Sequence, residues 1–89
     1  MYTGEVFVQN LTGLHARPAT EFVSCAGKFK SKITIKRSGD EKGVNAKSIV
    51  MLLSLALGQG SEVEISADGE DEKEAVDALV DLINTRFGE

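Results

Sequence analysis

The sequence predicts an α+β fold, an open-faced sandwich in which three helices cover one face of a four-stranded, mainly antiparallel sheet. Two observations carry this prediction. Stretches with alternating apolar residues and stretches with helical apolar spacing follow one another in the order βαββαβα. Each alternating stretch has one apolar face, which helices on that side must cover. The chain contains no linker, repeat or low-complexity stretch, so residues 1–89 are expected to form a single domain.

The first two elements are a strand and a helix. Val6 and Val8 are apolar and Glu5 and Gln9 are polar, which indicates the period-two pattern of a strand, although the apolar Phe7 interrupts the alternation. A loop is expected over residues 10–13. Apolar residues then recur at helical spacing over residues 16–26, and Gly27 is a typical residue for the end of a helix.

A pair of strands is expected next. Residues 32–36 alternate cleanly between polar and apolar side chains. The polar stretch 38–43 contains two glycines and is typical of a turn. Residues 44–46 would then form a short return strand.

The second half of the chain predicts two helices with a strand between them. A helix is expected over residues 48–57, with Gly58 after its end. Residues 62–66 alternate again and predict the last strand. The last helix is expected to begin at Asp71, with Glu74 three residues later as a capping-box-like pair.

Composition and charge argue against several classes of protein. The net charge of −4 argues against a nucleic-acid binder. One cysteine, Cys25, precludes an intrachain disulfide, and with one histidine it supplies too few ligands for structural zinc, so neither metal nor cofactor is expected. Residues 1–9 do not resemble a secretory signal, and no apolar run approaches the roughly 18 residues of a membrane span. These features predict a cytoplasmic protein without membrane insertion.

The segment around His15 is the most informative for chemistry. His15 stands where a loop becomes a helix, and the first turn of a helix has unpaired backbone N–H groups that attract anions. Pro18 suits a first turn because its missing N–H would be unpaired there. Arg17 adds a positive charge that can bind phosphate through two hydrogen bonds. The segment therefore predicts a phosphoryl acceptor at His15, with Ala16 and Arg17 as the phosphate cradle.

The same helix terminus disfavours a protonated imidazole, so His15 is expected to be neutral and nucleophilic at physiological pH. The alternative is that His15 merely caps the helix or is half-buried, and its neighbours Arg17 and Pro18 make this less attractive. One histidine, without a second acid or base or a nucleotide-binding motif, leaves too few groups for an independent enzyme. The chain is therefore interpreted as a phosphoryl-transfer protein.

A second segment of interest begins at Ser48. This residue is a typical helix N-cap, and a phosphate on its hydroxyl would be tolerated at a helix N-terminus. The helix that follows, residues 49–57, is apolar nearly all round, which exceeds what one sheet-facing side requires. Either neighbouring elements bury the excess or it forms a docking patch, and the periodicity does not separate the two.

Two motifs in this order, residues 13–19 (GLHARPA) and 44–49 (VNAKSI), resemble those of the HPr family. These are phosphocarrier proteins of the bacterial phosphoenolpyruvate-dependent phosphotransferase system, and the resemblance extends over essentially the whole chain. It implies the βαββαβα fold predicted above. It also implies that enzyme I phosphorylates His15 on the ring nitrogen nearer the backbone. Phospho-His15 would then donate to enzyme IIA components for sugar uptake.

The resemblance implies further roles. Arg17 would stabilise the phosphate, and Ser48 would be the regulatory serine of the HPr kinase/phosphorylase, with a catabolite regulator as a further partner. Ile49, Val50 and Leu53 would form the docking surface. A carrier that meets two partners at one face is expected to be a monomer.

Two alternatives remain open at this point. The chain could be a nitrogen-branch (NPr-type) regulatory phosphocarrier that uses His15 in the same way. It could also be a non-catalytic α+β binding module, since a fold does not determine a function. Replacing His15 with alanine separates the binding module from both carriers, because only the carriers would lose their activity.

Overall fold

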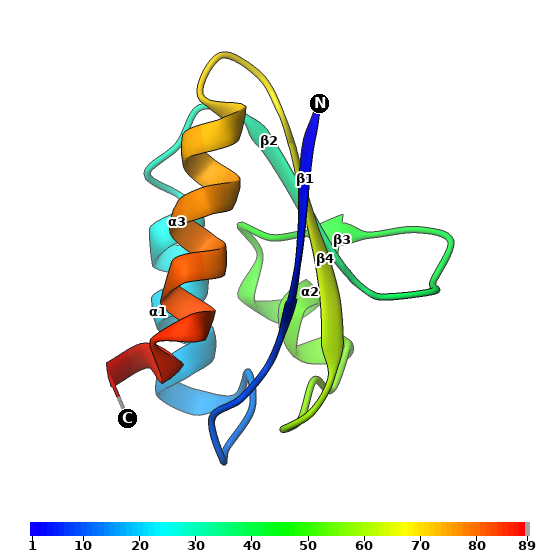
Figure 1. Cartoon of the computed structure of the whole chain (residues 1–89), viewed down its shortest axis with the longest axis vertical. Coiled ribbons are helices and arrows are strands. Elements are labelled where there is room, and N and C mark those ends of the chain that lie inside the picture. Colours follow the sequence, from blue (N-terminus) through cyan, green and yellow to red (C-terminus); the bar gives the residue numbers. More distant parts are fainter. Residues whose placement is uncertain (89) are drawn as a thin grey trace.

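The computed structural model describes residues 1–88, and in this part of the chain it shows the two-layer sandwich that the sequence predicts (Figure 1). The order βαββαβα is confirmed, and a short 3₁₀ turn follows the last helix. The elements are β1 (Tyr2–Phe7), α1 (Ala16–Ala26), β2 (Lys32–Arg37), β3 (Val44–Asn45), α2 (Ile49–Ser54), β4 (Glu62–Asp68), α3 (Glu72–Asn84) and η1 (Arg86–Gly88).

The four strands form one sheet in the order β1-β4-β2-β3, and each neighbouring pair is antiparallel. In the register of β1 and β4, Gly4 lies opposite Ile65. A Cβ at Gly4 would lie 2.9 Å from Val76, so β1 approaches α3 too closely for a larger residue. Figure 1 shows α1 and α3 on the same side of the sheet.

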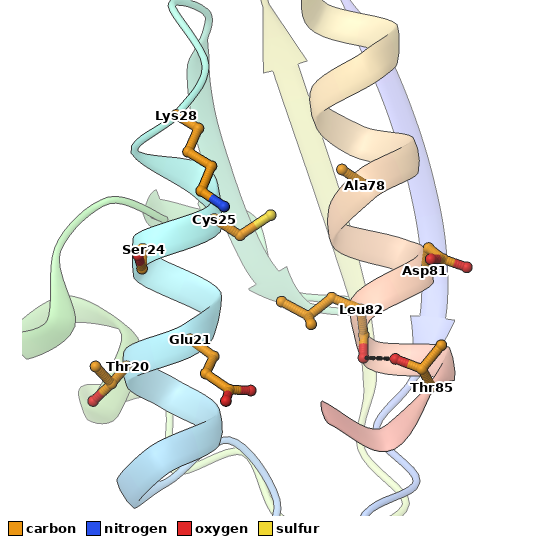
Figure 2. A pocket seen from close by; sticks show the side chains of 9 residues that line it. All are labelled: Thr20, Glu21, Ser24, Cys25, Lys28, Ala78, Asp81, Leu82 and Thr85. Atoms are coloured by element: carbon orange, nitrogen blue, oxygen red, sulfur yellow. Dashed lines mark hydrogen bonds between the residues drawn. The ribbon is translucent and has the colours of Figure 1, made fainter. Parts of the chain in front are cut away.

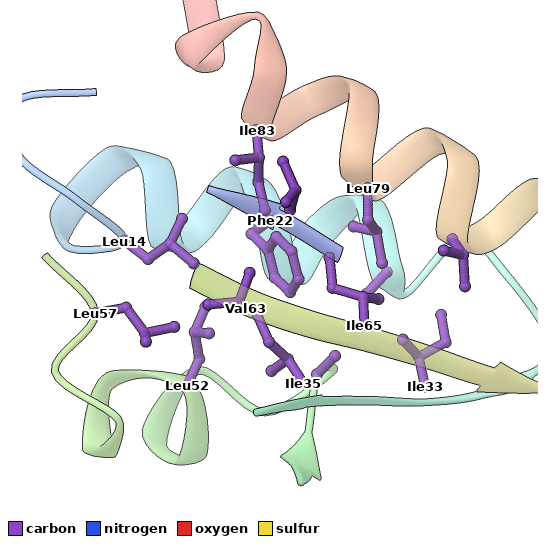
Figure 3. Close-up of a cluster of buried hydrophobic side chains, with 14 of the residues drawn as sticks. Leu14, Phe22, Ile33, Ile35, Leu52, Leu57, Val63, Ile65, Leu79 and Ile83 are labelled. Carbon is purple, nitrogen blue, oxygen red and sulfur yellow. The ribbon is translucent and has the colours of Figure 1, made fainter. Parts of the chain in front are cut away.

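The hydrophobic core lies between the sheet and the helices (Figure 3). Phe22 of α1, Leu52 of α2, Ile65 of β4 and Leu79 of α3 are fully buried in it. Each side chain of this size contributes about 1.5–3 kcal/mol to stability when it is buried. The loop residue Leu14 is also fully buried, so the loop before α1 is anchored directly in the core.

The α2 helix is shorter than the sequence predicts, because it ends at Ser54 rather than near residue 57. Ala56 has a left-handed backbone with φ of 50°, a conformation that cannot continue a right-handed helix. The Arg37 guanidinium donates 2.8 Å to the carbonyl of Leu55 and more weakly to that of Ala56. A side chain from β2 therefore satisfies carbonyls at the end of the helix.

The predicted capping box at the start of α3 is wrong. Asp71 occupies the N-cap position, but its carboxylate makes no capping hydrogen bond. It accepts instead from the backbone N–H groups of Lys30 and Ser31, at 2.9 and 3.0 Å, and from the Ser31 hydroxyl. The carboxylate thus connects the loop after α1 to the start of α3, and Glu72 rather than Glu74 accepts from the loop, from Gly69 N–H at 3.2 Å.

These bonds make a prediction about acid stability. Hydrogen bonds from the Ser31 hydroxyl and from the backbone N–H of Lys30 lower the pKa of Asp71 to about 2. An aspartate in the unfolded chain has a pKa of about 3.9. The stabilisation that ionised Asp71 gives the folded protein is therefore complete above that pH and is lost as the pH falls to about 2. We expect Asp71→Asn to lower the melting temperature at pH 7, and the difference from the unaltered protein to shrink towards pH 2.

Thermal unfolding followed by circular dichroism between pH 7 and 2 measures this difference. Asp40→Asn, in the exposed turn before β3, is the matched control and should change the melting temperature little at any pH. A difference for Asp71→Asn that stayed constant down to pH 2 would show that ionisation of this carboxylate does not stabilise the fold.

Candidate functional site

The loop before α1 is closed by a tight turn over Asn10–Gly13. The N–H of Gly13 donates to the carbonyl of Asn10 at 3.1 Å, and the Asn10 side chain donates to the carbonyl of Gly13 at 2.8 Å. Gly13 has φ of 68°, and a Cβ there would lie 2.4 Å from the carbonyl oxygen of Leu57. Only glycine fits this position, both for its backbone conformation and for the space around it.

The loop is also joined to the segment between α2 and β4. The N–H of Leu14 donates to the carbonyl of Leu57 at 2.9 Å. Further along, the N–H of Gly60 donates to the carbonyl of Val8 at 2.7 Å. These bonds place the start of α1 next to the end of α2, so the two segments singled out in the sequence lie together in the fold.

His15 occupies the N-cap position of α1, with an extended backbone (φ −131°, ψ 163°). His15 is half-buried. The imidazole makes no capping hydrogen bond within the described chain, so a capping role does not account for this histidine. The first turn of α1 follows directly, and its N–H groups have no carbonyl partners within the helix.

The residue after His15 has a strained backbone. Ala16 has φ of 52° and is exposed. For a residue other than glycine this left-handed conformation costs about 1–2 kcal/mol, and such conformations persist where the surrounding structure imposes them. The sequence pattern around Ala16 does not predict this conformation.

Arg17 is exposed, and its guanidinium contacts one residue of α1 and one of η1. It forms an ion pair with Glu21, one helical turn further on, and donates 3.3 Å to the carbonyl of Phe87 in η1. Arg17 was predicted from the sequence as a site residue, but neither contact was predicted. The i, i+4 spacing of Glu21 could have indicated the first, whereas no local signal connects residue 17 to residue 87. Pro18 lies in the first turn of α1, as predicted, and it is buried there.

Ser48 caps α2, as predicted, and its hydroxyl accepts from the N–H of Met51 at 3.3 Å. The apolar residues that follow are largely not covered by neighbouring elements. The exposed fraction is 37% for Ile49, 72% for Val50 and 42% for Leu53, whereas Leu52 is fully buried. The structure therefore favours an exposed apolar patch over complete burial, which the sequence alone did not decide. We call Ile49, Val50, Met51 and Leu53 the α2 patch.

A shallow groove of about 560 Å³ lies between α1 and α3 (Figure 2). Cys25 lines it from α1 and points toward α3, with Leu82 on the opposite wall. Burial raises the pKa of the Cys25 thiol, which disfavours a reactive thiolate. Cys25 is therefore interpreted as a structural residue.

The sequence model of the family described as "PTS HPr component phosphorylation site" matches residues 2–85. The chain belongs to the HPr family. HPr proteins are phosphocarriers of the phosphotransferase system, and the resemblance stated from the two sequence motifs is thereby confirmed. The described part of the chain has no helix with the length and hydropathy needed to cross a membrane.

The similarity to individual HPr proteins extends over the full length of the chain. The Haemophilus influenzae phosphocarrier protein HPr is 49% identical over 96% of this chain and 98% of its own length. The HPr-like protein Crh of Halalkalibacterium halodurans is 48% identical over 93% of this chain and 96% of its own length. A crystal structure of HPr-C-His from Thermoanaerobacter tengcongensis superimposes with a TM-score of 0.95 at 52% identity. The match covers 100% of this chain and 98% of that chain. An HPr dimer from that organism has also been crystallised, with a TM-score of 0.78.

Proposed function

We propose that His15 of this HPr protein accepts a phosphoryl group from enzyme I and passes it to enzyme IIA components for sugar uptake. The observation that supports this most directly is the position of His15 immediately before the first turn of α1, with Arg17 two residues on. A nitrogen lone pair of the imidazole attacks phosphorus, and the bond from phosphorus to the donor breaks with its electron pair leaving on the donor. The ring nitrogen nearer the backbone is the expected nucleophile.

The residues around His15 are proposed to stabilise the negative charge of the transferred phosphoryl group without forming a covalent bond to it. The N–H groups of Ala16 and Arg17 belong to the first helical turn, where the helix dipole favours an anion. The exposed Arg17 guanidinium adds a fixed positive charge. Phosphoryl transfer depends chiefly on such positioning and charge stabilisation, so a small surface site without an enclosed pocket is sufficient.

Intact mass spectrometry tests the proposal directly. The protein is incubated with magnesium, phosphoenolpyruvate and a sugar-branch enzyme I, and we expect one added phosphoryl group that mild acid removes. His15→Ala should gain no mass. Addition only with the nitrogen-branch enzyme I would identify an NPr-type carrier, and no addition with either enzyme would favour a binding module.

We also propose that Ser48 is a regulatory site for an HPr kinase/phosphorylase, and that the phosphorylated form binds a catabolite regulator. Ser48 directly precedes the α2 patch, so about two negative charges on a phosphate would lie at the docking surface. We expect Ser48→Asp to weaken the affinity for enzyme I about 3- to 10-fold, if the facing surface is acidic.

Isothermal titration calorimetry with enzyme I measures this affinity. Ser48→Asn is the matched control, because asparagine caps a helix as well as aspartate does but carries no charge. Equal affinities for the two variants would contradict the electrostatic explanation.

The α2 patch, with Ile49, Val50 and Leu53, is proposed as the surface on which enzyme I and the IIA components dock. The patch and His15 lie close together because the Leu14–Leu57 hydrogen bond joins their segments. A partner that covers the patch would therefore approach the imidazole. We propose that the protein acts in the cytoplasm as a monomer, which leaves this face open to both partners. Sedimentation equilibrium distinguishes it from a dimer.

A further inference from the structure

One side chain outside the proposed charge-stabilising residues acts on the backbone that leads to His15. The peptide unit between Gly13 and Leu14 is held at both of its polar atoms. Its carbonyl oxygen accepts from Asn10 Nδ2 at 2.8 Å, and its N–H donates to the Leu57 carbonyl at 2.9 Å. Because a peptide unit is planar, fixing both atoms fixes the orientation of the whole unit.

We infer that Asn10 is a positioning residue for phosphoryl transfer at His15, an inference that rests on the proposed function. Only Leu14 separates the fixed peptide from His15, and the Leu14 side chain is fully buried in the core. The backbone that enters His15 therefore has little freedom to rotate. The strained φ of Ala16 on the other side of His15 indicates that its surroundings impose the local geometry.

Asn10 acts in this loop as a hydrogen-bond donor. Asn10 is only 2% exposed. The two hydrogens of Nδ2 are directed to the Gly13 carbonyl and, at 3.2 Å, to the Thr12 hydroxyl. Its Oδ1 is buried and has no hydrogen-bond partner among the described residues. These two contacts are therefore both donated by the amide nitrogen of the side chain, and the shorter one holds the Gly13 carbonyl.

The Asn10 contact should act on the rate of transfer rather than on docking. The α2 patch, through which partners are proposed to bind, makes no hydrogen bond with Asn10 in the described structure. Misplacing a reacting group by about 1 Å can reduce a rate about 100-fold. We therefore expect Asn10→Ala to lower kcat for phosphorylation by enzyme I about 10- to 100-fold, with KM changed less than about twofold.

Gln59→Ala is the matched control. Gln59 is an exposed amide that also bonds to this loop, through Nε2 to the Gln9 carbonyl at 3.1 Å, but it does not reach the Gly13–Leu14 peptide. We expect its kcat and KM to be unchanged. Thermal melts ensure that all variants are compared while folded.

Asn10→Asp adds a pH-dependent readout that a merely structural role would not produce. Burial raises the pKa of the introduced carboxyl, and the protonated form can donate to the Gly13 carbonyl as the amide does. The ionised form only accepts and would repel that oxygen. The ratio of kcat for Asn10→Asp to kcat for the unaltered protein should therefore rise about tenfold as the pH falls from 8 to 6.

The outcomes separate this inference from the function on which it rests. A fully phosphorylated unaltered protein together with a normal kcat for folded Asn10→Ala would overturn the role of Asn10 alone. A rise in KM without a fall in kcat for Asn10→Ala would also overturn that role. So would a ratio of kcat for Asn10→Asp to kcat for the unaltered protein that does not change with pH. Absence of phosphate on the unaltered protein would overturn the proposed function and this inference with it.

Discussion

Replacing Gly13 with alanine should reduce the free energy of unfolding by about 2–5 kcal/mol and strongly impair phosphorylation of His15. The added Cβ would lie 2.4 Å from the Leu57 carbonyl oxygen and 2.7 Å from Gly58 Cα, both of which are backbone atoms. The left-handed φ of 68° adds a conformational penalty for alanine. Urea unfolding measures the first effect and intact mass after incubation with enzyme I the second.

Gly60→Ala is the matched control for this result. Gly60 lies in the facing segment and also has a left-handed φ, of 90°, but no atom lies within 4 Å of a Cβ built there. Its substitution should cost only the conformational penalty and should leave phosphorylation unaffected. If Gly13→Ala were no more destabilising than Gly60→Ala, the contact between the loop and the α2–β4 segment would not constrain His15.

The close approach at Gly13 shows why the segment between α2 and β4 matters to the position of His15. Gly13 is required because the Leu57 backbone passes so close, and Leu57 lies there because α2 ends early at Ser54. Arg37 helps to end α2 by donating to the Leu55 carbonyl. The position of His15 relative to the α2 patch therefore depends on contacts from β2, well outside either sequence motif.

The parts of this structure that local pattern determines could be predicted from the sequence. Alternation identified β2 and β4, because each strand buries one face, and helical spacing identified α1 and α3 for the same reason. His15 at the start of α1 and Ser48 as the cap of α2 also follow from short-range rules. These features need no knowledge of the rest of the fold.

The parts that depend on distant residues could not be predicted. Asp71 has the residue type and position of a helix cap, but Ser31 and the loop after α1 offer it three hydrogen bonds, and these prevail over the cap. The contact of Arg17 with Phe87 spans 70 positions. The donor role of Asn10 was missed as well, because an asparagine in a loop is ordinary and its importance depends on the peptide it faces.

Arg17→Ala should slow phosphorylation of His15 by about 100- to 1,000-fold, the usual effect of removing one group that stabilises developing charge. The fold should remain intact. The Arg17 and Glu21 side chains are 55% and 37% exposed, and an ion pair of this kind contributes at most about 1 kcal/mol. Rapid-quench kinetics with enzyme I measures the rate, and urea unfolding measures the stability.

Two further variants show which property of Arg17 matters. Lys73→Ala removes a similar exposed i, i+4 ion pair, with Asp77 on α3, and should leave the rate unchanged. Arg17→Lys keeps the charge but loses the planar fork of the guanidinium, so its rate should lie between those of Arg17→Ala and the unaltered protein. A normal rate for folded Arg17→Ala would remove Arg17 from the site, and the N–H groups of the first turn of α1 would then carry the stabilisation of phosphate alone.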